Sequence, residues 1–237
     1  MTHLQSLETP RLLLDRERLE RNAERMRERC KALGVTLRPH LKTPKSLHVA
    51  RVAGGGTLPP ATVSTLNEAE YFARGGIADV LYAVGFTANK TSRLLRIQRE
   101  TGQRVTILTD DAATLRSVAE IAARQEETVS VCIEIDCGEH RGGLPAGDPL
   151  VVQLAEIAAR APSLHFRGVM THAGHSYASP DPRVISRIAG EERDAAVAAA
   201  DAIRDAGIAV DMISVGSSPT IQYADHLVGV TEARCGI

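Results

Sequence analysis

The apolar positions of this chain follow two patterns that alternate from one end to the other. Short runs of β-branched and apolar residues, typical of buried strands, alternate with stretches in which apolar residues recur every three or four positions, as on one face of a helix. The strand-like runs are Val35–His40, Thr62–Thr65, Val80–Val84, Arg104–Thr109, Val129–Asp136, Phe166–His172, Met212–Gly216 and Leu227–Glu232. The helix-like stretches are Arg16–Leu33, Lys45–Ala53, Leu66–Arg74, Asn89–Glu100, Ala112–Arg124, Pro149–Arg160, Val184–Ala206 and a short Ile221–His226.

Eight strands that alternate with helices over 237 residues predict an α/β fold, a closed (β/α)8 barrel of the TIM type, which commonly uses about 250 residues. An open doubly wound sheet is the alternative, although it more often has fewer and longer units. Strands such as Val129–Ile135 are apolar on both faces, as expected where helices cover a parallel sheet. Asp15, Asn89 and Asp110 or Asp111 stand where helix N-caps are favoured.

Composition excludes several classes of function. Lys and Arg number 28 against 29 Asp and Glu, which gives a net charge of −1 and no basic excess for binding nucleic acid. Aromatic residues make up 3% and Trp is absent, so stacking platforms for single strands are missing. No run approaches the ~20 apolar residues of a membrane span, and Met1–Arg11 has no signal-peptide pattern. Four cysteines without a C-x-x-C spacing fit a reducing compartment. We therefore expect a cytoplasmic protein.

The first strand-like run ends in the basic segment Arg38-Pro-His40-Leu-Lys42-Thr-Pro-Lys45. Reactive residues of such barrels lie at the carboxyl ends of strands, so Lys42 is expected at the barrel mouth. The like charges of its neighbours Arg38, His40 and Lys45, together with loss of water, would favour the neutral amine that forms Schiff bases. A solvated lysine in a basic loop is the alternative interpretation.

The seventh run ends in the small polar segment Ser214-Val-Gly216-Ser-Ser-Pro-Thr220, which leads into a helix. Backbone N–H groups and hydroxyls are accessible in such a turn, and the loops after strands seven and eight of these barrels often bind phosphate. A generic turn is the alternative, because the lysine and spacing of a P-loop are missing. A phosphate loop that faces Lys42 would suit pyridoxal 5′-phosphate (PLP), which requires both an amine and a phosphate anchor.

The fifth and sixth runs end in further polar residues. Arg141 lies among glycines in Asp136-Cys-Gly-Glu-His-Arg141-Gly-Gly, where a permanent cation could stabilise a phenolate or carboxylate. His172, His175 and Tyr177 follow the sixth run, and histidines in a strand-end loop suit proton transfer or metal contact. Structural histidines are the alternative. Cys137 and His140 have the spacing of a metal-binding pair, but they lack further ligands of matching spacing.

Five segments together resemble the D-threonine aldolase and D-serine dehydratase family, PLP enzymes of fold type III whose barrel is similar to that of alanine racemase. The segments are Thr9-Pro10 with Leu14-Asp15, Arg38-Pro-His-Leu-Lys42-Thr, Asp136-x-Gly-x-x-Arg141-x-Gly143, His172-Ala-Gly-His175 and Gly216-Ser-Ser-Pro-Thr220. The resemblance runs from about residue 8 to the last residue. Pro44 departs from it, because many members have His at this position.

The resemblance implies a role for each matching residue. Lys42 matches the Schiff-base lysine, Arg141 matches an arginine near the cofactor ring, and His175 matches a residue close to the substrate. His172 is expected to be catalytic from its place at the strand end. The residues expected to bind the cofactor besides Lys42 are His40, Arg141, Tyr177, Gly216, Ser217, Ser218 and Thr220.

The segment Glu232-Ala-Arg-Cys-Gly-Ile237 looks like the last barrel strand of this family, which a β-rich C-terminal domain follows. Residues 1–237 are therefore expected to form the PLP-binding barrel alone. The family's divalent metal, which is manganese, magnesium or zinc, is expected to have its ligands in that C-terminal domain. The full-length protein is expected to be a homodimer.

The function implied is that of a PLP-dependent lyase acting on D-β-hydroxy-α-amino acids, with D-threonine cleavage to glycine and acetaldehyde placed first. D-Serine dehydration is the alternative within the family. An amino-acid racemase and a non-catalytic PLP carrier are alternatives outside it. The expected partner is a small D-amino acid, and neither nucleic acid nor a membrane is expected.

Overall fold

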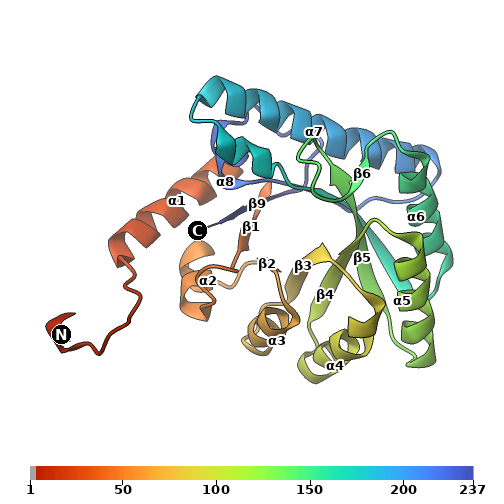
Figure 1. Ribbon diagram of the computed structural model, residues 1–237, viewed down its shortest axis with the longest axis horizontal. Helices are drawn as coiled ribbons and strands as arrows, with labels where there is room; N and C mark the ends of the chain where they lie inside the picture. The colour runs from red at the N-terminus through yellow and green to blue at the C-terminus, as the bar shows by residue number, and fades with distance from the viewer. Residues whose placement is uncertain (1–3, 237) are drawn as a thin grey trace.

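A computed structural model describes residues 4–236 and shows a closed barrel of eight parallel strands surrounded by helices (Figure 1). The barrel strands are β1 (Thr36–His40), β2 (Ala61–Val63), β3 (Asp79–Gly85), β4 (Arg104–Thr109), β5 (Val129–Asp136), β7 (Leu164–Thr171), β8 (Met212–Val215) and β9 (Glu232–Gly236). The two-residue strand β6 (Leu144–Pro145) pairs beside β5 outside the ring. Pairing of β4 with β5 and of β1 with β9 closes the ring, so the predicted barrel is confirmed.

The helices follow the strands as the periodicity predicts. They are α1 (Arg16–Ala32), α2 (Leu47–Ala53), α3 (Leu66–Arg74), α4 (Thr91–Thr101), α5 (Ala112–Arg124), α6 (Pro149–Arg160), α7 (Pro182–Asp205) and α8 (Ser218–Tyr223). Asp15 and Asp111 cap α1 and α5 by accepting hydrogen bonds from backbone N–H groups, as expected. The expected cap at Asn89 is wrong, because Asn89 lies in a 3-10 turn and α4 begins at Thr91. Residues 4–236 include no helix long and apolar enough to cross a bilayer.

The prediction for the last strand is also wrong in its position. The apolar run Leu227–Glu232 is mostly a loop, in which Gly229 has φ +89° and Val228 is 72% exposed. The strand starts only at Glu232. Its residues that face the barrel interior are the charged Glu232 and Arg234, so it lacks the apolar pattern by which the other strands were predicted. The final helix likewise starts earlier than predicted, since Ser217 caps it and forms a capping box with Thr220.

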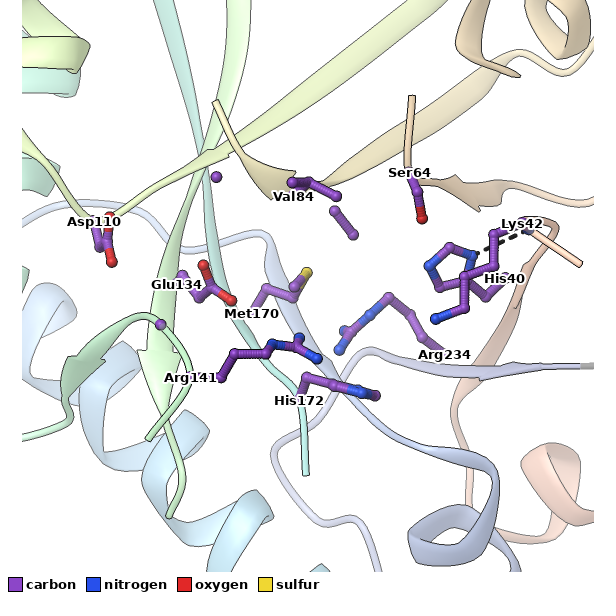
Figure 2. Close-up of a pocket in the computed structure, with 13 residues that line it drawn as sticks. His40, Lys42, Ser64, Val84, Asp110, Glu134, Arg141, Met170, His172 and Arg234 are labelled. Carbon is purple, nitrogen blue, oxygen red and sulfur yellow. Dashed lines mark hydrogen bonds between the residues drawn. The ribbon is translucent and has the colours of Figure 1, made fainter. Parts of the chain in front are cut away.

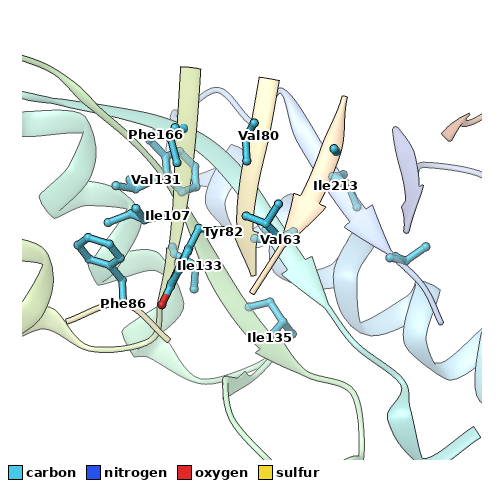
Figure 3. Packing of buried hydrophobic residues seen from close by; sticks show 14 of the residues in the cluster. Val63, Val80, Tyr82, Phe86, Ile107, Val131, Ile133, Ile135, Phe166 and Ile213 are labelled. Atoms are coloured by element: carbon cyan, nitrogen blue, oxygen red, sulfur yellow. The ribbon is translucent and has the colours of Figure 1, made fainter. Parts of the chain in front are cut away.

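The main apolar core fills the space between the strands and the surrounding helices, and Figure 3 shows part of it. The barrel interior is different and is arranged in layers along β3. Asp79 begins the strand in a charged layer, Leu81 belongs to a small apolar cluster with Met170 and Met212, and Ala83 lines a cavity at the carboxyl end. Alternation of inward-facing residues along each strand produces such layers.

The charged layer consists of ions that are buried at the amino end of the barrel. Arg38 is 1% exposed, and its guanidinium lies 2.8 Å from Glu232 Oε1 and 3.1 Å from Asp79 Oδ2. Arg167 also binds Asp79, at 3.0 Å. Burial alone would raise the pKa of Asp79, but Arg38 and Arg167 outweigh it and lower this pKa. The layer therefore joins β1, β3, β7 and β9 through paired charges.

We predict that Glu232→Ala lowers the free energy of unfolding by about 3–5 kcal/mol, the usual effect of removing one partner from a buried ion pair. Chemical denaturation of parent and variant measures this difference. Glu20→Ala is the control, because Glu20 pairs with Arg16 on the exposed surface of α1 and such pairs contribute little. Equal unfolding midpoints for the two variants would contradict the importance of the charged layer.

Candidate functional site

A cavity of about 410 Å³ opens at the carboxyl end of the barrel, where the site residues were expected. Figure 2 shows its lining residues. They are His40, Lys42, Ser64, Ala83, Val84, Gly85, Asp110, Glu134, Arg141, Gly142, Met170, His172 and Arg234. A small hollow of about 70 Å³ shares His40, Lys42, His172 and Arg234 with the cavity and is completed by Tyr177, Gly216, Ser217, Cys235 and Gly236.

Lys42 is the residue on which both spaces converge. It follows β1 by two residues, and its side chain lines both the cavity and the hollow. The expected influence of Arg38 and Lys45 is wrong, because neither brings an unpaired charge to Lys42. Arg38 points into the charged layer, and Lys45 pairs with Glu68 at 3.4 Å. The neighbours that line the same spaces are His40, His172 and Arg234.

The two imidazoles of the cavity are held neutral. Burial lowers the pKa of His40 to about 3, and the positive charges of Lys42 and Arg234 add to this effect. Burial also lowers the pKa of His172. The Nδ1 of His172 lies 3.0 Å from the carbonyl oxygen of Gly216 and must donate to it, so in the neutral ring Nε2 is the basic nitrogen.

Arg234 is a site residue that the strand-end patterns do not single out. It is buried on β9, donates to Ser214 Oγ at 2.5 Å and also donates to the carbonyl of Thr171. Burial lowers the pKa of Arg234, and the carboxylates of Glu192 and Glu232 act in the opposite direction. Arg234 is two residues after Glu232, so the two side chains face the same side of a strand. This pattern could have identified Arg234, but only with the last strand placed at Glu232–Gly236.

The opposite side of the cavity is acidic. Figure 2 shows Asp110 and Glu134 away from Lys42, with Arg141 beside Glu134. Burial raises the pKa of Glu134, and the charge of Asp110 raises it further. The side chain of Arg141 is 59% exposed and lies 3.5 Å from Glu139, so much of its guanidinium faces the open cavity.

The predicted phosphate loop forms one wall of the hollow. Gly216 has φ +127°, and a Cβ there would collide with the carbonyl oxygen of Arg234, so only glycine fits. Ser217 and Thr220 are buried, and their hydroxyls bond within the wall: Ser217 Oγ lies 2.8 Å from Ser176 Oγ, and Thr220 Oγ1 donates to Glu192 Oε2 at 2.9 Å. The more accessible donors belong to Ser218, whose backbone N–H donates to Tyr177 Oη at 3.3 Å.

His175 lies outside the lining of both spaces. It belongs to the 3-10 turn Gly174–Ala178, and its ring lies near Gly138, where an added Cβ would be 3.8 Å from Nε2. Its Nδ1 is buried without a hydrogen-bond partner. Of the two histidines in this loop, the structure therefore brings His172 to Lys42.

Among residues 4–236 there is no group of three or more His, Cys, Asp or Glu residues that could hold a metal ion. Cys137 and His140 do not form a pair: burial raises the pKa of Cys137 to about 12, whereas His140 is exposed and bonded to Asp136 at 2.7 Å.

Comparison with known proteins gives consistent matches over nearly the whole chain. Residues 14–237 match the family model described as alanine racemase, N-terminal domain. D-threo-3-hydroxyaspartate dehydratase of Delftia sp. (strain HT23) is 39% identical over 235 residues, which cover 99% of this chain and 61% of the relative, and its solved structure superposes with a TM-score of 0.93. 3-Hydroxy-D-aspartate aldolase of Paracoccus denitrificans (strain Pd 1222) is 32% identical, with coverage of 97% and 59%. The structure of D-threonine aldolase from Filomicrobium marinum matches with 27% identity, coverage of 98% and 62%, and a TM-score of 0.86. The chain thus spans about three fifths of the length of these relatives.

The low pKa of His40 generates a prediction on acid stability. The unfolded ring binds a proton near pH 6.5 and the folded ring only near pH 3, so the unfolded state binds more protons between these values and stability falls as the pH is lowered through this window. Between pH 7 and pH 5 this one group should remove about 2 kcal/mol.

The measurement compares urea unfolding at pH 7 and pH 5 for the parent and for His40→Asn. The variant should lose less stability on acidification than the parent. His48→Asn, at an exposed position on α2, should keep the parental difference. The same acid dependence in His40→Asn and the parent would show that His40 does not resist protonation.

Proposed function

Because the chain belongs to the family of the alanine racemase N-terminal domain, we propose that it binds PLP at the carboxyl end of its barrel and serves a lyase that acts on D-β-hydroxy-α-amino acids. The observation that carries the proposal is the position of Lys42. Lys42 lines both the large cavity, which has room for a substrate, and the small hollow, which we assign to a phosphate group.

The residues present fit PLP. The hollow is bounded by backbone at Gly216 and Gly236 and by the phenol of Tyr177, and Gly216 leaves room that a Cβ would remove. Backbone N–H groups and hydroxyls at the start of a helix are the donors that phosphate oxygens prefer. We assign direct phosphate contact to Ser218 and Tyr177. The backbone N–H groups of Gly216 and Ser217 already donate to Glu192 and Thr220, so these two residues and the buried hydroxyls of Ser217 and Thr220 hold the loop in shape.

The remaining residues surround the space between the hollow and the acidic wall. His40 and the guanidinium groups of Arg234 and Arg141 lie where they would contact the ring or the anionic groups of PLP and substrate. When bound, PLP supplies an electron-withdrawing ring that stabilises negative charge developing on the substrate. The cations of the site balance the negative charges of phosphate and carboxylate.

His172 is the residue that we assign to proton transfer. It is neutral and its Nε2 is the basic nitrogen, so it can accept a proton from the substrate and return it to a product. His175 was expected next to the substrate, and it remains a second candidate that would have to move to reach the cavity.

The reaction within this class depends on which substrate bond breaks. Cleavage of D-threonine requires removal of the hydroxyl proton and breaks Cα–Cβ, whereas dehydration of D-serine or D-threo-3-hydroxyaspartate removes the α-proton and expels the hydroxyl. A divalent metal would polarise that hydroxyl in either case. We propose metal dependence and a homodimer for the whole protein, from the family resemblance.

We predict that Lys42→Ala abolishes covalent capture of PLP. Borohydride treatment of the parent mixed with PLP should fix the cofactor on the peptide that contains Lys42, as detected by mass spectrometry. Lys45→Ala is the control and should leave this modification in place, because Lys45 faces Glu68. Modification spread evenly over surface lysines, or kept in Lys42→Ala, would refute the assignment.

The reaction itself is tested with the holoprotein expressed from its complete gene, supplied with PLP and Mn²⁺ or Zn²⁺. D-Threonine, D-serine, D-threo-3-hydroxyaspartate and their L-enantiomers are assayed for glycine, keto acid and ammonia. We expect products from D-enantiomers only and a fall in rate of about 10²-fold or more in His172→Asn. Racemisation without cleavage would instead support a racemase, and PLP binding without turnover would support a carrier.

A further inference from the structure

A buried carboxylate on α7 contacts both loops of the candidate site without lining the cavity. Glu192 is 1% exposed, and both of its oxygens accept hydrogen bonds. Oε1 accepts from Thr171 Oγ1 at 3.1 Å, from the backbone N–H of Ala173 at 3.1 Å and from that of Gly216 at 2.9 Å. Oε2 accepts from Thr220 Oγ1 at 2.9 Å. One side chain thus ties the end of β7 to the end of β8.

The contacts on Oε1 surround His172. Thr171 and Ala173 are its two neighbours in the chain, and Gly216 supplies the carbonyl oxygen that receives the proton on His172 Nδ1. Glu192 binds the backbone N–H of Gly216, and the carbonyl oxygen of the same residue binds His172. The bond to Glu192 therefore helps to fix the position of this carbonyl group. Oε1 thus contacts both chain neighbours of His172 and the residue whose carbonyl oxygen receives its proton.

The contact on Oε2 acts on the phosphate loop. Thr220 Oγ1 accepts from the backbone N–H of Ser217 at 3.0 Å while it donates to Glu192. With its hydroxyl hydrogen directed to Glu192, Thr220 is oriented to close the capping box that sets the start of α8. The shape of the hollow wall from Gly216 to Ser218 depends on this arrangement.

We propose that Glu192 is a positioning residue that sets the tautomer of His172 through Oε1 and the shape of the phosphate loop through Oε2. The second half rests on the proposed binding of PLP, and the first half does not. A substitution that separates the two oxygens should therefore separate the two effects.

Glutamine is such a substitution. Its single carbonyl oxygen can replace Oε1, while its NH₂ group would face Thr220 as a donor and turn the hydroxyl hydrogen of Thr220 away, toward the carbonyl oxygen of Ser217 at 3.2 Å. Glu192→Gln should keep the Nδ1–H tautomer of His172 and weaken PLP binding at least ten-fold, the usual loss for one hydrogen bond to a charged group. Glu192→Ala should lose both properties. Glu191→Gln is the matched control, because the neighbouring Glu191 faces solvent and pairs with Arg187.

The tautomer is measured by long-range ¹H–¹⁵N spectra of histidine side chains in the PLP-free protein, and PLP affinity by absorbance titration. Thr220→Val removes the Oε2 contact from the other side and also the bond from Ser217 N–H, so it should weaken PLP binding at least as much as Glu192→Gln does. The double variant Glu192→Gln/Thr220→Val should bind PLP little more weakly than Thr220→Val alone, because Thr220→Val has already removed the Oε2 contact.

The outcomes separate this inference from the proposed function. A parent protein that binds no PLP would refute the proposed function, while the tautomer in Glu192→Ala would still test the first half. Should Glu192→Ala fail to fold, Thr171→Val replaces it, with a mixed tautomer expected for His172. If folded Glu192→Ala keeps both the parental tautomer and the parental PLP affinity, the assignment is overturned. Without folded Glu192→Ala, the parental tautomer in Thr171→Val together with the parental PLP affinity in Glu192→Gln would overturn it. Fully additive effects in the double variant would also overturn it.

Discussion

Parallel pairing between β1 and β9 is the constraint on which the site depends. The register places Arg38 opposite Arg234 and His40 opposite Gly236, so the first and last strands of the barrel end side by side. Lys42 follows one of these strands, and Arg234 and Gly236 belong to the other. Closure of the ring therefore assembles the amine, the buried guanidinium and the small hollow from segments at opposite ends of the chain.

The same pairing explains why the barrel interior tolerates so many charges. Inward-facing residues of β9 alternate, so that Glu232 enters the charged layer at the amino end while Arg234 reaches the cavity. Each ion of the charged layer meets a partner of opposite charge on another strand, either adjacent or across the barrel, as a buried charge requires. The apolar layer with Leu81 and Met212 separates the two ends, which lets the upper one serve a ligand while the lower one holds the strands together.

Hydrophobic periodicity was sufficient to predict most of the fold. The outer face of each strand packs against helices, so its apolar residues recur in the sequence, and the ring order follows from eight successive βα units. Periodicity misplaced β9, because the apolar residues Leu227 and Val230 belong to a buried loop whereas the strand that follows carries charged side chains inward. Local composition does not distinguish a buried loop from a strand when the strand faces a polar interior.

The candidate site was predictable only where a strand end marked it. Lys42, His172 and the Gly216 loop lie just after strands and Arg141 lies in the loop that follows β5, and the structure places them around two spaces that share lining residues. Glu192 lies in a long helix, where the apolar spacing of Ile185, Ile188 and Ala196 places it on the buried face and leaves Glu191 outside that face. The spacing does not show which loops the buried carboxylate contacts. Likewise, the direction of His175 is set by a 3-10 turn whose backbone the sequence pattern does not specify.

The central claim is that pairing of β1 with β9 creates one PLP site, in which Lys42 and the hollow act together. A crystal structure of the protein with PLP tests this claim most directly. We predict electron density that is continuous from Lys42 Nζ to the cofactor, with the phosphate in the hollow between Tyr177, Gly216 and Gly236. Cofactor density that begins at another lysine, or a phosphate bound outside this hollow, would contradict this assignment.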